Sequence, residues 1–556
     1  MNVHRLWMGL LLALTAFAYA AAQPKREVRA VWVATVYGLD WPSCAARTGR
    51  DVRRQQDELR RLLDRCVETN LNTVMLQVRL RGDVAYRSDL EPPAECFDPK
   101  GSGRMPYDPL AFAIDECHRR GLELHAWMVT MPLGSDRLVR RQGGRSVVRR
   151  RPALCVHHHG EWFLNPGEPA ARDYLTRLAT EVAERYDVDG IHLDYIRYPD
   201  RPQGFGDDRT YRTYGQGQTL ADWRRGNLTA LVESIAHAVR SRKPWLKLTC
   251  ATLGRRADGT WNAYHTVYQD AERWLHDGWV DGVTPMLYVR DESFFGPAFD
   301  WLAHRHNGWM IPGLGLYRLD THDADWDAAD IERQIYTARL SGMNGQALYR
   351  ARYLADDVKG ICRRLATDLY ACPALPPATP RAGIDAPLPP HSLHTYDDGT
   401  TTHLSWEPSP TAAEREVRYV VYASDTWPVP THEASCIVGT HIGRPAYAHR
   451  YTYPTQRRRF YAVSTLDRYG QESEPLQQPK PEPQALTARA GGALHLPSTS
   501  DAREAIFTDV CGLVRARMPY ASVLHLPSTL PAGCYRLRLT GRDGTTLAEH
   551  TCILTR

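Results

Sequence analysis

The segment Gly190–Pro199 ends an apolar run in a group of acidic, basic and aromatic side chains. Alternate residues of a strand face opposite ways, so the prediction puts His192, Asp194 and Ile196 on one face and Ile191, Leu193 and Tyr195 on the other. Asp194 then lies at the carboxyl end of a strand, next to Tyr195 and close to Arg197. In a closed parallel barrel that end carries the active site, so this carboxylate predicts chemistry on a polar, ring-shaped ligand. The structural alternative is that Asp194 caps a loop or pairs with Arg197.

The elements that must position Asp194 are short apolar runs alternating with amphipathic stretches, from Glu27 to about Cys372. Strands are predicted at residues 29–35, 73–79, 123–128, 190–197, 247–252, 282–288, 310–316 and 346–349. Helices, each with apolar positions three or four apart, are predicted at residues 52–68, 109–120, 170–186, 220–242, 264–276, 298–306 and 331–340. Eight such units predict an α/β fold, a (β/α)8 TIM barrel. An open doubly wound sheet is the alternative, but no glycine fingerprint follows the first strand to hold a dinucleotide.

Composition divides the 556-residue chain into five parts. These are a signal peptide at 1–22, the barrel at 23–372, a proline-rich linker at 373–390, a small β-sandwich at 391–482 and a second small all-β domain at 483–556. The apolar core of residues 1–22 is too short to cross a bilayer and is followed by small residues, which is typical of a cleaved export signal. We therefore expect an exported protein, in the periplasm, on the outer-membrane surface or secreted, with no integral membrane segment after cleavage.

Positive and negative charges nearly balance over the whole chain, but one segment carries an excess of positive charge. The formal net charge is +5, from 69 basic and 64 acidic residues, which does not call for a nucleic-acid partner. Residues 137–151, however, hold seven Arg and no Asp or Glu. This segment is either a solvated surface loop or a rim that attracts anionic groups of a substrate. Three consecutive side chains rarely converge on one ion, so His157, His158 and His159 predict no metal site, and no cofactor is expected.

Seven separated blocks of the barrel region resemble the family 10-like glycosyl hydrolases, a (β/α)8 family of bacterial cell-envelope proteins. The blocks are EVRAVWVATVYGLDWPS (27–43), LNTVMLQVRLRGDVAYRS (71–88), GLELHAWMVTMPLG (121–134), FLNPGEPAARDYL (163–175), GIHLDYIRYP (190–199), TWNAYHTVYQDAERWL (260–275) and VDGVTPMLYVRD (280–291). The sequence after Pro390 is similar to a fibronectin type III module. The segments DVCGLVRARMPY (509–520) and LPAGCYRLRLTGRDGTTLAEHTCIL (530–554) resemble the carboxy-terminal sorting domain of some Bacteroidetes.

The resemblance implies an exported glycoside hydrolase that cleaves an amino-sugar-containing or other complex glycan, with peptidoglycan strands as one such substrate. The alternative is a carbohydrate-binding envelope protein without turnover. In either case the expected partner is a glycan, and the sequence leaves the oligomeric state open.

Cleavage of a glycosidic bond generally takes two carboxyl groups, and Asp194 is the first candidate. Asp83, after the second strand, and Asp291, after the sixth, are candidates for the second. Asp291 is slightly favoured as the proton donor because the apolar residues before it would raise its pKa by desolvation. The structural alternatives are an ion pair of Asp291 with Arg290, a helix cap, and a turn at Asp83 after Gly82.

Substrate binding is predicted for aromatic and polar residues at or just beyond strand ends, because flat rings stack on sugar faces and polar neighbours bind hydroxyl groups. The candidates are Arg79, His125, Trp127, Asn165, His192, Tyr195, Arg197, Trp261 and Tyr288. A structural histidine is the alternative at His125. Many relatives carry an Asn-Pro pair after the third strand where this chain does not, so that contact is either absent or supplied by Asn165.

Overall fold

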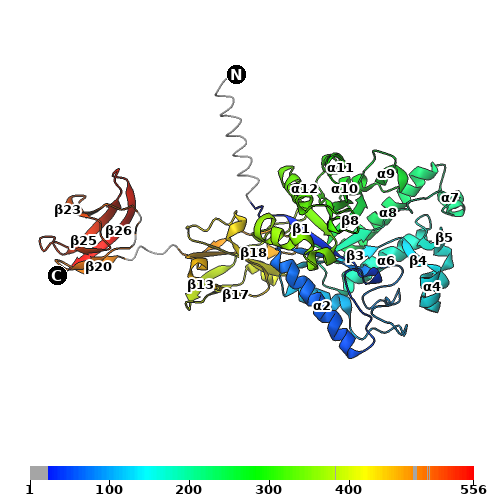
Figure 1. Ribbon diagram of the computed structural model, residues 1–556, viewed down its shortest axis with the longest axis horizontal. Coiled ribbons are helices and arrows are strands. Elements are labelled where there is room, and N and C mark those ends of the chain that lie inside the picture. The colour runs from blue at the N-terminus through cyan, green and yellow to red at the C-terminus, as the bar shows by residue number, and fades with distance from the viewer. Residues whose placement is uncertain (1–22, 382, 480–484, 498, 500) are drawn as a thin grey trace, which may run out of the picture. The chain divides into compact units, whose positions relative to one another are not determined.

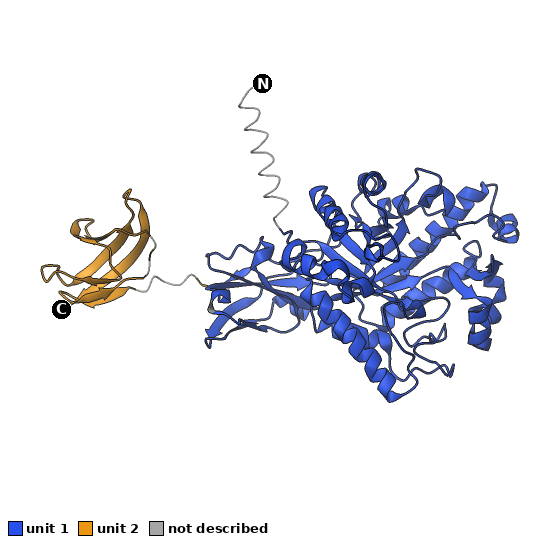
Figure 2. Cartoon of the chain, in the orientation of Figure 1, with its two compact units in different colours: residues 1–478 blue, residues 479–556 orange. Residues whose placement is uncertain are grey.

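The computed structural model describes residues 23–381, 383–479, 485–497, 499 and 501–556. The predicted signal peptide, residues 1–22, lies outside the described residues. The chain forms two compact units, residues 1–478 and 479–556 (Figure 2). The first unit contains both the barrel and a β-sandwich, and the second contains the last β domain.

The barrel is closed by eight parallel strand positions, as predicted (Figure 1). Seven positions are single strands, and the other is shared by the short strands β10 and β11, which both pair with β9. Pairing of β8 with β9 completes the ring. In order around the barrel the strands are β1 (Val28–Val33), β2 (Thr73–Arg79), β3 (Glu123–Val129), β7 (Gly190–Asp194), β8 (Lys247–Leu253), β9 (Gly282–Met286), β10 (Trp309–Met310) with β11 (Gly313–Gly315), and β12 (Gly345–Tyr349).

Helices cover the outside of this ring, and each buries an apolar stripe against the strands. On α2, a capping box of Thr48 and Asp51 starts the helix, and Leu59, Leu62 and Leu63 are buried. The main helices are α2 (Gly49–Glu68), α3 (Pro109–His118), α6 (Pro169–Arg185), α8 (Leu220–Arg240), α10 (Ala271–His276), α11 (Glu292–Ala303), α12 (Ala328–Leu340), α13 (Ala351–Ala355) and α14 (Ile361–Arg364). The helix predicted at 264–276 is interrupted, because Tyr268 adopts a positive φ of 62° between α9 (Ala263–Thr266) and α10.

Strand β7 ends earlier than the sequence predicts. Tyr195 has a φ of 51°, in the left-handed region, so the strand stops at Asp194. The alternation of faces is therefore lost after Asp194: Tyr195 packs with the residues inside the barrel, whereas Ile196 is buried in the outer core between strands and helices. The turn brings Tyr195 to the same side as Asp194.

An insertion after β3 builds part of the carboxyl-terminal rim. It contains a three-stranded antiparallel sheet of β4 (Pro132–Ser135), β6 (Glu161–Leu164) and β5 (Cys155–His158). The arginine-rich residues 137–151 lie between β4 and β5 and are folded rather than an open loop. Figure 1 shows α4 close to β4 and β5, at the far side of the barrel from the β-sandwich.

The β-sandwich follows the proline-rich segment and consists of two sheets. One sheet is β13 (His391–Asp397), β14 (Thr401–Glu407) and β17 (Ala446–Arg450), and the other is β16 (Ile437–Ile442), β15 (Val417–Ser424), β18 (Phe460–Asp467) and β19 (Leu476–Gln477). Within the proline-rich segment, Leu375 is fully buried and the Arg381 Nε lies 3.1 Å from an Asp281 carboxylate oxygen. Leu375 is part of the core of the sandwich, whereas Arg381 pairs with a barrel residue, so this segment bridges the sandwich and the barrel.

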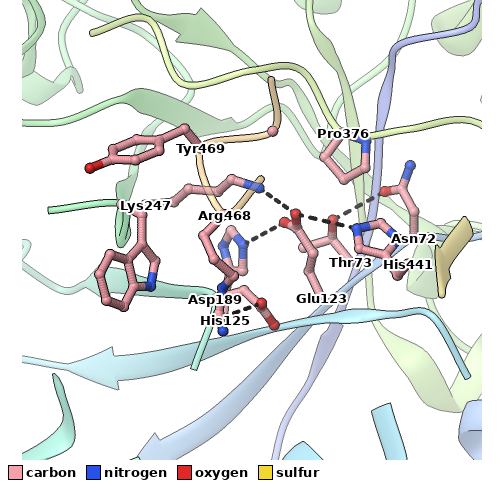
Figure 3. Close-up of polar contacts among 12 residues, drawn as sticks. Asn72, Thr73, Glu123, His125, Asp189, Lys247, Pro376, His441, Arg468 and Tyr469 are labelled. Carbon is pink, nitrogen blue, oxygen red and sulfur yellow. Dashed lines mark hydrogen bonds and ion pairs between the residues drawn. The ribbon is translucent and has the colours of Figure 1, made fainter. Parts of the chain in front are cut away.

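A buried polar network joins the sandwich to the amino-terminal end of the barrel (Figure 3). Arg468 of the sandwich lies 3.3 Å from Asp189, which precedes β7. Inside the barrel, Glu123 pairs with Lys247, and it lies 3.9 Å from His441 of the sandwich. The amino-terminal mouth of the barrel is thus covered by the sandwich, and the carboxyl-terminal mouth is the end left for a ligand.

The second unit is an all-β domain with its own core. Its five-stranded sheet has the order β20 (Leu486–Arg489), β26 (Thr546–Thr555), β25 (Gly533–Thr540), β22 (Glu504–Asp509), β23 (Val514–Pro519), and β21 (Ala493–His495) pairs with β24 (Val523–His525). Phe507, Leu537 and Leu539 are fully buried between these strands. The barrel followed by small all-β domains confirms the predicted fold class.

Candidate active site

Asp194 is buried at the carboxyl end of β7 and is held by two N–H donors. The Trp127 indole Nε1–H donates to its Oδ2 at 3.0 Å, and the Tyr195 backbone N–H donates to its Oδ1 at 2.6 Å. Trp127 comes from the neighbouring strand β3, whose parallel register sets Val129 beside Asp194. The carboxylate is therefore fixed in one orientation by groups that belong to the ends of two adjacent strands.

This carboxylate lines a cavity of about 280 Å³ at the rim, which we call the Asp194 cavity. Among its lining residues Asp194 is the only acid, and six of the fifteen are aromatic. The rings of Tyr288 and Tyr349 stack with centroids 5.2 Å apart. The lining residues are Trp32, Ala34, Val36, Tyr37, Leu39, Gln77, Arg81, Trp127, Val129, Asp194, Tyr195, Ala251, Met286, Tyr288 and Tyr349. Such walls can stack on the apolar faces of a sugar.

Burial raises the pKa of Asp194, while Arg197, the Tyr195 N–H and the Trp127 N–H oppose that rise. Arg197 lies over the Tyr195 ring, with its Cζ 4.5 Å from the centroid. Its Nε and Nη1 are buried and have no hydrogen-bond partner in the described part of the chain. A fixed cation beside the carboxylate thus offsets part of the cost of burying its charge.

His192 lies one layer below Asp194, deeper in the barrel. It is fully buried, and its Nδ1 is 2.9 Å from the Thr249 hydroxyl oxygen. Burial lowers its pKa to about 3, and His125 adds to that effect. His192 is therefore neutral at ordinary pH, and the Trp32 ring packs against it at 5.7 Å.

A second cavity of about 320 Å³ adjoins the first and is called the Asp83 cavity. Asp83 is 5% exposed, and its Oδ1 accepts the Arg81 backbone N–H at 3.0 Å. Burial raises the pKa of this carboxyl to about 7. The Asp83 carboxyl therefore keeps its proton up to near-neutral pH, which suits a proton donor.

The two cavities share Val36, Tyr37 and Arg81. Tyr37 is 83% exposed and has a φ of 57°, so it projects into solvent at the boundary. The Arg81 Nη1 lies 3.3 Å from a Glu161 carboxylate oxygen of β6. The shared residues join the cavities into one candidate binding surface, with a carboxyl group in each part.

The structure places Asp291 apart from this surface. Its side chain is 61% exposed, and it lies near Arg290 and Arg333 at the start of α11. Trp261 is 48% exposed and is also absent from the lining of both cavities. Of the three carboxylates suggested by the sequence, the structure brings Asp194 and Asp83 to adjoining cavities and leaves Asp291 outside.

Three polar candidates are occupied by contacts within the protein. Arg79 is fully buried, where its Nε and Nη2 donate to Glu91 and its Nη1 donates to the Thr130 carbonyl. The Asn165 side chain bonds Thr210 and the Gly167 backbone N–H. The Nε2 of His125 lies 3.3 Å from Glu123, in the network near the sandwich (Figure 3). None of the three lines either cavity.

Sequence reasoning did not single out Gln77, Tyr349, Tyr37 or Arg81. Alternation within strands could have found Gln77 and Tyr349. Gln77 lies two residues after Met75, and Tyr349 lies two residues after Ala347, and both Met75 and Ala347 face the inside of the barrel. The Gln77 Oε1 accepts the backbone N–H groups of Thr35 and Val36 and so holds the loop that carries Tyr37. Tyr37 and Arg81 lie in loops, where no periodic signal exists.

The described residues contain no group of three or more His, Cys, Asp or Glu side chains arranged to hold a metal ion. None of the helices in that part of the chain combines the length and apolar character needed to traverse a lipid bilayer.

Comparison with known proteins agrees with this geometry. The sequence profile of the family described as glycosyl hydrolase-like 10 matches residues 27–317. Glycosyl hydrolase YngK of Bacillus subtilis (strain 168) is 30% identical over 437 residues, covering 73% of this chain and 84% of the relative. Glycosyl hydrolase DigH of Escherichia coli (strain K12) is 32% identical over 378 residues, covering 60% and 84%.

Among solved structures, the chain matches the glycoside hydrolase domain of PgaB (BpsB) from Bordetella bronchiseptica. It is 15% identical, with a TM-score of 0.39, and the match covers 61% of this chain and 99% of that chain. The barrel, its aromatic rim cavity and the relatives together define a glycan-acting (β/α)8 protein. The chain belongs to the glycosyl hydrolase-like 10 family.

Proposed function

We propose that this protein is an exported enzyme that hydrolyses glycosidic bonds in an amino-sugar-containing or other complex glycan, with peptidoglycan strands as the first substrate to test. The observation that carries the proposal is the fixed Asp194 carboxylate in an aromatic cavity at the carboxyl-terminal rim. The relatives named as glycosyl hydrolases support the reaction class. The proposal of export depends on the signal-like composition of residues 1–22.

In this proposal the two carboxyl groups take different roles because their surroundings differ. Asp194, with two N–H donors and Arg197 nearby, acts as the carboxylate that attacks the anomeric carbon or activates a water. Asp83, with its pKa raised to about 7, donates the proton to the departing oxygen. The scissile bond then lies across Tyr37 and Arg81, the residues that both cavities share.

The test is the release of new reducing ends from purified glycan strands. The native protein is expected to release them, and Asp194→Asn is expected to lose at least 10²-fold in rate while keeping its far-UV circular dichroism spectrum. Asp291→Asn is the matched control, because it removes an exposed carboxylate outside both cavities. Equal rates for the native protein and Asp194→Asn would contradict the proposal.

The second candidate is a carbohydrate-binding envelope protein without turnover. The same aromatic cavity supports it, since stacking alone binds sugars. Glycan binding by the native protein, with no reducing ends released by any variant, would favour this alternative.

A further inference from the structure

The arginine-rich residues 137–151, called here the arginine segment, form an ordered surface. They fold as α4 (Asp136–Gln142), a 3-10 turn and α5 (Val147–Arg150). Val139 and Val148 are 6% exposed and anchor these short helices to the barrel core. The apolar anchors fix the backbone, so the arginines between them are held at defined places on the surface.

Three of these arginines have no partner in the described part of the chain. Arg137, Arg140 and Arg149 are exposed, and they make no hydrogen bond or ion pair with the residues that the structure describes. The segment contributes seven positive charges and no negative ones to a chain whose formal net charge is +5, so the remainder of the chain is net −2. Like charges gathered on one short segment repel, and a bound anion would reduce that repulsion.

The arginine segment is continuous with the candidate active site. Leu138 and Arg141 of α4 line the Asp83 cavity. The Gln142 side-chain Nε2 donates to the Gly82 carbonyl at 3.3 Å, which ties α4 to the loop that carries Asp83. A polymer held in the cavities would therefore pass onto this surface.

We infer that the arginine segment binds the acidic portion of the glycan, and hence that the substrate is a polysaccharide with carboxylates on recurring sugars. The inference rests on the proposed function and adds the charge of the substrate to it. Guanidinium groups pair with carboxylates in a planar, two-point geometry, which suits exposed arginines that have no other partner among the described residues. An acidic polysaccharide accounts for the aromatic residues of the Asp194 cavity as well as for the charge, whereas a nucleic acid accounts only for the charge.

The experiment measures binding in an Asp194→Asn background, so that turnover does not remove the ligand. The probes are peptidoglycan glycan strands and polygalacturonate, each with its own carboxyl-reduced form, in which the carboxylates have become alcohols. The test variant adds Arg137→Gln, Arg140→Gln and Arg149→Gln. The control adds Arg53→Gln, Arg61→Gln and Arg363→Gln, which change the same total charge at exposed positions on α2 and α14.

At least one acidic probe is expected to bind roughly tenfold more tightly than its reduced form at low ionic strength, as three exposed ion pairs allow. The preference is expected to disappear in the test variant, to persist in the control, and to shrink as salt rises. Equal affinity for acidic and reduced forms, no binding of any probe, or an unchanged preference in the test variant would overturn the inference.

Duplex DNA serves as the competing polyanion. Tighter binding of DNA than of either acidic probe, lost in the test variant, would overturn the inference in favour of a nucleic-acid surface. Salt-dependent binding of an acidic probe with no hydrolysis by the native protein would instead contradict only the proposed function.

Discussion

Replacing Asp83 by Asn should stabilise the protein at alkaline pH and slow its reaction. Because the folded-state pKa of Asp83 is raised to about 7, the folded protein binds this proton more tightly than the unfolded chain does. The resulting stabilisation is fully present below about pH 4 and is lost as the pH rises through 7. A shift of roughly 3 pH units corresponds to about 4 kcal/mol lost between pH 4 and pH 8. Asn keeps an oxygen that can accept the Arg81 N–H, and it carries no charge to bury.

The assay is urea unfolding of both proteins at pH 5 and pH 8, followed by tryptophan fluorescence. Other titrating groups are common to both proteins, so the difference between them isolates Asp83. The difference in urea midpoint, Asp83→Asn minus native, should be roughly 1 M larger at pH 8 than at pH 5, for an m-value of about 3 kcal/mol/M. The same variant should lose about 10²- to 10⁴-fold in kcat. A midpoint difference that does not change with pH would refute the assignment of a buried, protonated carboxyl.

Three other substitutions give separable outcomes. Arg79→Met should lower the free energy of unfolding by about 3 to 5 kcal/mol, because it leaves the Glu91 carboxylate buried without its partner. Adding Glu91→Leu should restore much of that loss. Urea titration measures the free energy of unfolding of both variants. Trp127→Phe removes an N–H donor from Asp194 and should therefore move the acidic limb of the pH–rate profile upward, whereas an unmoved limb would argue against that bond. Asp291→Asn should keep at least half of the native rate of reducing-end release, and a loss comparable to that of Asp194→Asn would return Asp291 to the catalytic site.

The barrel could be predicted from the sequence because its signals are periodic. Strand β2 was predicted at its observed bounds, Thr73–Arg79, since all seven residues are buried and hydrophobic ones dominate the run. The end of β7 could not be predicted, because the positive φ falls on a tyrosine, with no glycine or proline at that position to signal a turn. The same reason explains the interruption of the helix at Tyr268.

Site residues at the ends of strands could be predicted from the sequence, whereas contacts made by residues in the loops could not. Asp194 and Trp127 face the same cavity as expected from parallel neighbouring strands. The sequence could not tell that Arg79, at the equivalent end of β2, turns away to pair with Glu91, because that partner lies in a loop twelve residues later. The sequence also could not favour Asp83 over Asp291 as the proton donor, because the burial of a carboxyl group in a loop depends on tertiary packing.

The central claim is that Asp194 meets the anomeric carbon of a sugar bound among the rim aromatics. The most direct measurement is a crystal structure of Asp194→Asn with a bound oligosaccharide. We expect the side chain of residue 194 to lie about 3 to 3.5 Å from the anomeric carbon, or to hold a water between the two. An oligosaccharide bound elsewhere, with no sugar in the Asp194 cavity, would contradict the claim.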